Sequence, residues 1–193
     1  MGSGTRTIAL ASLLAIAAAC GNGDGGGTAS PEPPGGDGVA AEAWLADVCG
    51  ATKGWVDQIV ALQAGLQEDL DASSVEALKD TMVGYFDEVL GVTDDMLDEI
   101  DAAGVPDAEG GQAAADAVSG GLGEVRDVLQ RARDDAADLP TGDPQEFSRE
   151  LRTIAREVQT SLGEVGDTMA QLQSPELDRA AEDVPECREL EQV

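Results

Sequence analysis

Histidine is absent from this chain, and several motifs that carry enzyme chemistry are missing with it. Histidine is the side chain whose unperturbed pKa lies nearest neutrality, so the commonest general base and metal ligand are lacking. Its absence also excludes the Glu-x-x-His pair of di-iron carboxylate bundles. There is no phosphate-binding glycine loop and no Gly-x-Ser-x-Gly nucleophile motif. We therefore expect a protein that is not an enzyme and that uses no cofactor.

Basic and aromatic residues are scarce as well. The chain has 39 Asp and Glu against 11 Lys and Arg, which leaves a formal net charge of -28. A surface this acidic repels nucleic acid, so we exclude nucleic acid as a partner. Only 3% of the residues are aromatic, and the two tryptophans, Trp44 and Trp55, are spaced three helical turns apart. Two interpretations of this pair stay open: core packing near Cys49, and an anchor for a ligand or partner.

No apolar run is long enough to cross a membrane. The longest, residues 8–19, falls short of the about 20 helical residues that a bilayer core requires. It follows Arg6 and ends in small residues, which is the pattern of a secretory signal peptide over residues 1–19. Residues 17–20, Ala-Ala-Ala-Cys, resemble the lipobox of bacterial lipoproteins, with Ala17 where that family prefers leucine. The resemblance implies cleavage before Cys20 and attachment of a diacylglycerol, with fatty acids such as palmitate, to its thiol.

The leader therefore predicts where the protein resides. A lipid on Cys20 would hold it at the cell membrane, facing outside the cytoplasm. Ala17-x-Ala19 is also acceptable to ordinary signal peptidase, and that alternative would make it a secreted protein. Residues 20–38 are rich in Gly and Pro and have almost nothing to bury, so we expect a disordered tether. Residues 39–193 are then one folded domain.

Three cysteines occur, at positions 20, 49 and 187. An odd number in an exported protein normally leaves one thiol unpaired. If Cys20 carries a lipid, Cys49 and Cys187 remain as a pair in an oxidising compartment, where disulfides persist. The cysteine count therefore favours lipidation of Cys20 and a Cys49–Cys187 disulfide together.

Apolar residues then recur at helical spacing in four segments of about 30 residues, with no strand pattern. Ser73 and Glu76 predict a capping box with Ser73 as the N-cap, and Gly104 with Pro106 predicts the end of that helix. The next segment, about 107–139, contains five glycines, and we expect it to be firm only from Val118. Asp143 predicts the N-cap of the last long helix, and a short helix is expected over about 175–183.

Short connections make sequential helices antiparallel, so the segments predict an all-α fold, an up-down-up-down four-helix bundle. The fourth helix then ends where the first begins. The tail after it can reach the first helix, and the predicted disulfide staples it there. The helix count and the cysteine positions thus agree with each other.

Acidic residues are unevenly distributed along these helices. Residues 68–109 contain fourteen acids and one base, whereas residues 124–157 contain nine acids and six arginines. The second helix is therefore predicted to carry an acidic edge. It is either a solvated face or a docking surface for a basic partner or weakly held divalent cations. Its candidate interaction residues are Asp87, Asp94, Asp95, Asp98 and Asp101.

Three short motifs carry a second resemblance: WLADVCGATKGWV at 44–56, AGVPDAEGG at 103–111 and VPECREL at 184–190. They resemble small helical secreted proteins and lipoproteins of high-GC Gram-positive bacteria. The group has no assigned activity, so the resemblance implies localisation and fold only. The function predicted is a non-enzymatic, membrane-anchored adaptor or interaction module of the cell envelope with an unidentified protein partner. The alternative is an extracytoplasmic binding protein for a small ligand or divalent cations.

Overall fold

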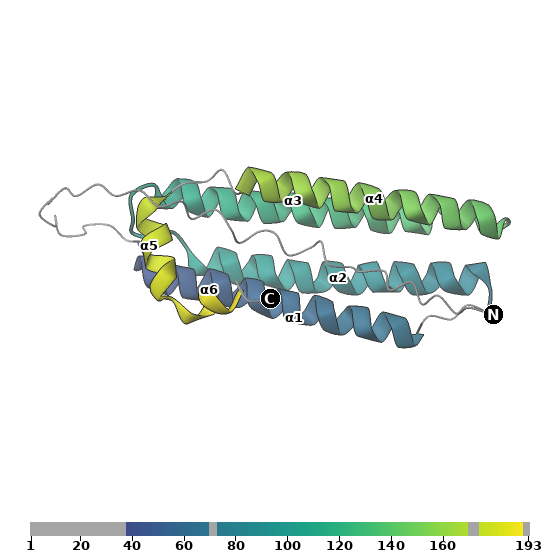
Figure 1. The fold of residues 1–193 in the computed structure, drawn as a ribbon, viewed down its shortest axis with the longest axis horizontal. Coiled ribbons are helices and arrows are strands. Elements are labelled where there is room, and N and C mark those ends of the chain that lie inside the picture. Colours follow the sequence, from purple (N-terminus) through teal and green to yellow (C-terminus); the bar gives the residue numbers. More distant parts are fainter. Residues whose placement is uncertain (1–37, 70–72, 170–173, 191–193) are drawn as a thin grey trace, which may run out of the picture.

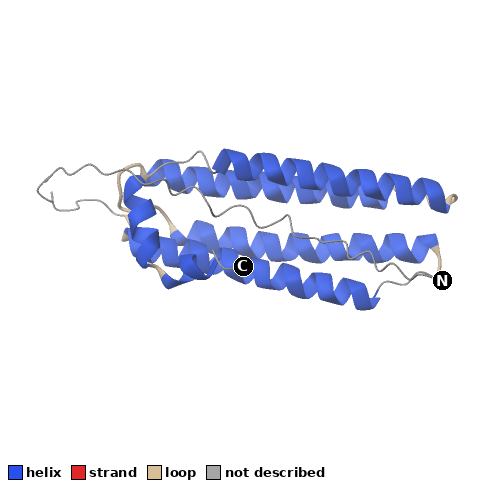
Figure 2. Ribbon diagram, viewed as in Figure 1, coloured by secondary structure: helices blue, strands red, loops and turns tan. Residues whose placement is uncertain are grey.

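The computed structural model describes residues 38–69, 73–169 and 174–190, and within these ranges it consists of helices and short connections (Figures 1 and 2). The four long helices have 29, 29, 27 and 26 residues, so at about 1.5 Å per residue each is about 40 Å long. The predicted signal peptide, Cys20 and nearly all of the predicted tether lie outside the described residues. The helices are α1 (Ala41–Asp69), α2 (Val75–Ala103), α3 (Gly111–Ala137), α4 (Pro144–Met169), α5 (Pro175–Asp183) and α6 (Pro185–Leu190).

Local capping sets most of the helix ends. The Asp143 carboxylate accepts from the backbone N–H groups of Gln145 and Glu146 at 2.8 and 3.4 Å, which confirms it as a cap. The predicted cap at Ser73 is wrong by one residue. Ser74 has the extended backbone of an N-cap, and its hydroxyl accepts from the N–H of the third helical residue at 3.1 Å. Gly104 ends α2 with a φ of 75°, as the sequence predicted.

The start of α3 depends on two adjacent glycines. Gly110 is the N-cap with a φ of 77°, a conformation that residues with a Cβ rarely adopt. At Gly111 a Cβ would lie 2.1 Å from the carbonyl oxygen of Pro106, so no side chain fits there. At Gly120 and Gly123 nothing lies within 4 Å of a built Cβ. The helix is continuous from Gly111, so the expected weak region before Val118 is helical after all.

The four long helices run antiparallel in sequence order, which confirms the predicted bundle (Figure 1). Extended packing joins α1 to α2, α2 to α3, and α3 to α4. Within the described ranges α1 and α4 share no such contact, so the bundle is open along one side. After α4 the chain turns back, and both α5 and α6 pack against α1.

The apolar core is divided along the bundle axis. At the α5–α6 end, Trp44, Ala103 and Leu177 belong to one cluster that joins α1, α2, α3 and the two short helices. Two middle clusters join α1, α2 and α3. At the opposite end, Phe86, Phe147 and their neighbours join α2, α3 and α4. Helix α4 therefore enters the core mainly through its first half.

Candidate functional site

The Cys49–Cys187 disulfide is present, as the cysteine count predicted, with the two Cα atoms 5.0 Å apart. It joins the third turn of α1 to α6. Cys187 is buried, and Leu177 and Val184 are buried in the same cluster. The disulfide and these side chains together hold the C-terminal helices against the end of the bundle where α1 begins.

The described chain also begins at this end. Val39 donates its N–H to the carbonyl of Val105 at 2.9 Å and accepts from the N–H of Asp107 at 2.7 Å. These bonds form an isolated bridge between the entry to α1 and the loop that follows α2. Residues preceding position 38 therefore connect to the protein next to the disulfide.

Both tryptophans contribute to the core. Trp44 is 3% exposed, and its Nε1–H donates to the carbonyl oxygen of Gly104 at 2.9 Å. Trp55 is half-buried, and its Nε1–H donates to the Thr93 hydroxyl at 3.0 Å. Thr93 in turn donates to the carbonyl of Val89 at 2.7 Å. This geometry supports core packing at Trp44 and leaves almost none of its indole for a partner.

Thr93 is a residue that sequence reasoning missed. Its relative exposure is 0%, and among the described residues it is the one buried side chain that is polar. Both hydrogen-bonding roles of its hydroxyl are used, so the group is satisfied inside the core. Its only signal in the sequence is its position on the apolar face of α2.

The predicted acidic edge divides into two sets of residues. Asp87 and Asp94 face α3, where they accept from Arg133 Nε at 2.8 Å and from Arg126 Nε at 2.6 Å. These hydrogen bonds, reinforced by the opposite charge, raise the pKa of both guanidinium groups. Asp101 accepts from the hydroxyl of Ser119 at 3.1 Å. From one of these three contacts to the next, the position moves seven residues forward along α2 and seven residues back along α3. The contacts are therefore regularly spaced between two antiparallel helices.

Asp95 and Asp98 are the remaining two residues of the edge. Both are exposed, and neither forms a hydrogen bond or an ion pair within the part of the chain that the structure describes. Only this smaller set is available to a basic partner. The other three carboxylates stabilise the contact between α2 and α3.

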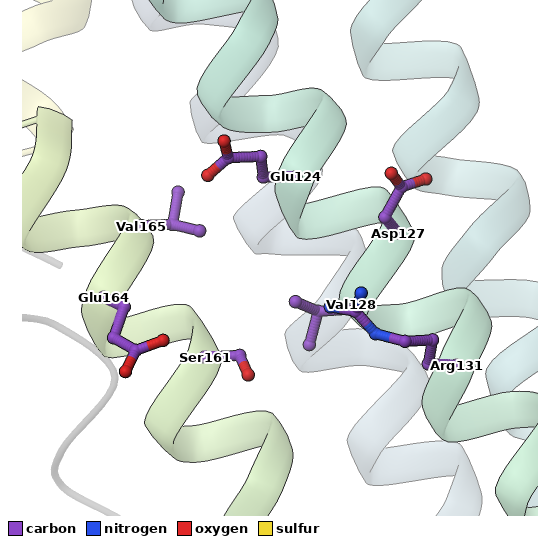
Figure 3. Close-up of a pocket in the computed structure, with 7 residues that line it drawn as sticks. All are labelled: Glu124, Asp127, Val128, Arg131, Ser161, Glu164 and Val165. Carbon is purple, nitrogen blue, oxygen red and sulfur yellow. The ribbon is translucent and has the colours of Figure 1, made fainter.

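A groove between α3 and α4 is the second feature that the sequence did not indicate. It has a volume of about 270 Å³. Figure 3 shows Val128 and Val165 pointing into the space between the two helices, with Glu124 reaching from α3 toward α4. Three carboxylates, one guanidinium and one hydroxyl line the groove beside the two valines. The lining residues are Glu124, Asp127, Val128, Arg131, Ser161, Glu164 and Val165.

The described residues contain no group of three or more His, Cys, Asp or Glu side chains placed to hold a metal ion. None of the described helices combines the length and the apolar character that crossing a membrane requires. Every buried side-chain nitrogen or oxygen in these ranges has a hydrogen-bond partner.

The fold and the disulfide together define an antiparallel helical bundle whose C-terminal helices are covalently fastened to its first helix. Comparison with known protein families, curated proteins and solved structures found no match to this chain.

Proposed function

We propose that this protein is a non-enzymatic lipoprotein of the cell envelope, anchored through Cys20, whose helical domain is an adaptor for another envelope protein. The observation that carries the proposal is the character of the core. Apolar side chains fill it, and Thr93, its buried polar residue, is satisfied by Trp55 and Val89. A rigid bundle of this kind suits recognition through its surface.

The alternative is a binding protein for a small ligand or a divalent cation, and the groove between α3 and α4 is where that ligand would bind. The groove is shallow and lies at the surface, and its carboxylates are spread along two helices. Hard cations prefer oxygen ligands that wrap around the ion. The geometry therefore supports the adaptor more strongly than the ligand-binding protein.

The anchor is tested by mass and by location. The intact mass of protein from the membrane fraction should correspond to a chain that begins at Cys20 and carries added lipid. Cys20→Ser should move the protein into the medium, because several buried CH₂ groups at about 0.8 kcal/mol each supply the attachment. A wild-type protein recovered in the medium with a free Cys20 thiol contradicts the anchor.

The adaptor role is tested by cross-linking on intact cells, followed by mass spectrometry of the captured proteins. The lipidated protein should capture a defined envelope protein. Reversing the exposed pair with Asp95→Lys and Asp98→Lys should weaken capture of a basic partner, mainly by slowing association, and the loss should depend on salt. If capture is unchanged, the exposed acids are only a solvated face. If no specific protein is captured, the adaptor proposal fails.

A further inference from the structure

The first half of α4 carries a stripe of positive charge in an otherwise strongly acidic protein. Arg149, Arg152 and Arg156 are spaced by three and four residues, so they lie on one face of the helix. All three are exposed, and the face is opposite the buried Phe147 and Ile154. They are three of the 11 basic residues in a chain with 39 acids. We call this stripe the α4 arginine face.

The acids of α4 neutralise this face only in part, and Glu157 and Glu164 border the same surface hollow as Arg156. Glu157 and Glu164 lie on the flank next to α3, where they line grooves at the helix surface. Arg149 is paired, since its Nη2 is 3.4 Å from Glu146 and 3.3 Å from Glu150.

The other two arginines have no carboxylate partner in the described part of the chain. The guanidinium of Arg156 donates to the carbonyl of Arg152 at 3.2 Å and to the hydroxyl of Thr153 at 3.1 Å. The guanidinium of Arg152 makes no hydrogen bond or ion pair within the described ranges. Arg126 and Arg133 of α3 differ, because each already pairs with an aspartate of α2. Two guanidinium groups on α4 therefore remain available for acids from outside.

No described helix covers this face. Helix α4 packs along α3, while α5 and α6 turn away to pack on α1 (Figure 1). The arginine half of α4 also shares its core cluster with the start of α2, at the end of the bundle opposite the disulfide. The face thus points outward in the half of the molecule far from the entry of residue 38.

We propose that the α4 arginine face docks an acidic helix of a partner protein, with carboxylates four residues apart opposite the unpaired Arg152 and Arg156. The contact between α2 and α3 shows pairing of this kind inside the molecule, because two aspartates of one helix pair there with two arginines of its antiparallel neighbour. Guanidinium groups suit such contacts, since their planar fork matches a carboxylate. The inference rests on the proposed adaptor function and names the chemistry of the partner surface that would meet α4.

The test uses a synthetic helical peptide with glutamates four residues apart on one face, titrated into purified protein carrying Cys20→Ser and followed by NMR chemical shifts. Shift changes should concentrate on α4 between residues 149 and 160 and disappear at high salt, because exposed ion pairs are screened. The double variant Arg152→Glu/Arg156→Glu should weaken binding by about tenfold, since it removes two pairs and adds repulsion. Arg179→Glu is the control, because this arginine is exposed on α5 and, within the described residues, donates only to the carbonyl of Pro175.

Four results would overturn the proposal. In the NMR titration they are shift changes outside α4, or an equal loss of peptide binding in the control variant and the double variant. In binding comparisons they are equal affinity for a peptide with the same glutamates in scrambled order, or tighter binding of phosphatidylglycerol vesicles than of the peptide. Circular dichroism of the double variant should match that of the parent, because both arginines are exposed. In the cross-linking experiment, undiminished capture by the double variant would contradict a role for the α4 arginine face and would leave the adaptor proposal standing. If no protein is captured at all, the adaptor proposal is wrong. The peptide titration would still show whether the α4 arginine face binds an acidic helix.

Discussion

Loss of the Cys49–Cys187 disulfide should destabilise the whole domain. The bond joins residues with a sequence separation of 138, and the chain-entropy model values closure of a loop this long at about 5 kcal/mol at 25 °C. In a chain of this size, each kcal/mol corresponds to about 2–4 °C in melting temperature. The double variant Cys49→Ser/Cys187→Ser should therefore melt about 10–20 °C below the oxidised protein, with its helix content at low temperature nearly unchanged.

The same change should release α5 and α6 before the rest unfolds. Leu177 of α5 and Val184, which lies between the two helices, are buried, and each contributes about 1.5–3 kcal/mol. Ordering the backbone costs about 1–2 kcal/mol per residue, so without the disulfide the two short helices are held only weakly. Local unfolding of this segment should then let trypsin cleave the backbone after Arg179.

The assay combines thermal melting with brief trypsin digestion, analysed on reducing gels so that a cut tail separates from the bundle. Cleavage after Arg179 should accelerate in the double variant, while cleavage after Arg126 in the middle of α3 should stay slow. Reductant should reproduce both effects in the parent and change nothing in the double variant. A melting temperature lowered by less than about 3 °C, with an unchanged rate of cleavage after Arg179, would refute the argument.

Three further predictions concern single side chains. Gly111→Ala should lower the free energy of unfolding, because its Cβ would meet the carbonyl oxygen of Pro106. Gly120→Ala should raise it by up to about 1 kcal/mol, because space is open there and alanine favours a helix. Chemical denaturation of both variants measures the two changes. Thr93→Val should cost about 1–3 kcal/mol in the same assay, because it leaves the half-buried indole N–H of Trp55 without its acceptor. The pKa of Glu76 is lowered by a hydrogen bond from its own backbone N–H to its carboxylate. A second hydrogen bond, from the hydroxyl of Thr141, also lowers it. Glu76 should therefore stabilise the fold at neutral pH and lose that contribution as the pH falls through its folded pKa. NMR titration that finds a normal or raised pKa contradicts this.

Much of the fold is visible in local patterns. Asp143 and Gly104 mark helix ends because capping depends on a few neighbouring residues, and such chemistry is readable from the chain. The pairing of Cys49 with Cys187 was predictable because the direction of four successive helices brings the tail back to α1. At Ser73 and Ser74, which are adjacent, the same chemistry did not show which of the two serines is the N-cap of α2.

The contacts across the bundle could not be predicted in the same way. Asp87 and Asp94 looked like part of one solvated edge, and their arginine partners on α3 became evident only once the register of α2 against α3 was known. That register depends on how the two apolar faces pack. The heptad spacing of the aspartates and of Arg126 and Arg133 was nevertheless a signal present in the sequence. The need for glycine at position 111 likewise arises from a carbonyl oxygen in the preceding turn.

The position of the disulfide decides how the domain would carry a mechanical load. Residue 38 enters beside the loop that follows α2, and Cys49 lies only three turns into α1. A pull on the N-terminal side of the domain can unravel residues 38–48 and then reaches a covalent ring that runs from residue 49 to residue 187. Tension between the two ends of the described chain would pass through the sulfur–sulfur bond and by-pass α2, α3 and α4. The surfaces on those helices would keep their shape even while the protein is being stretched.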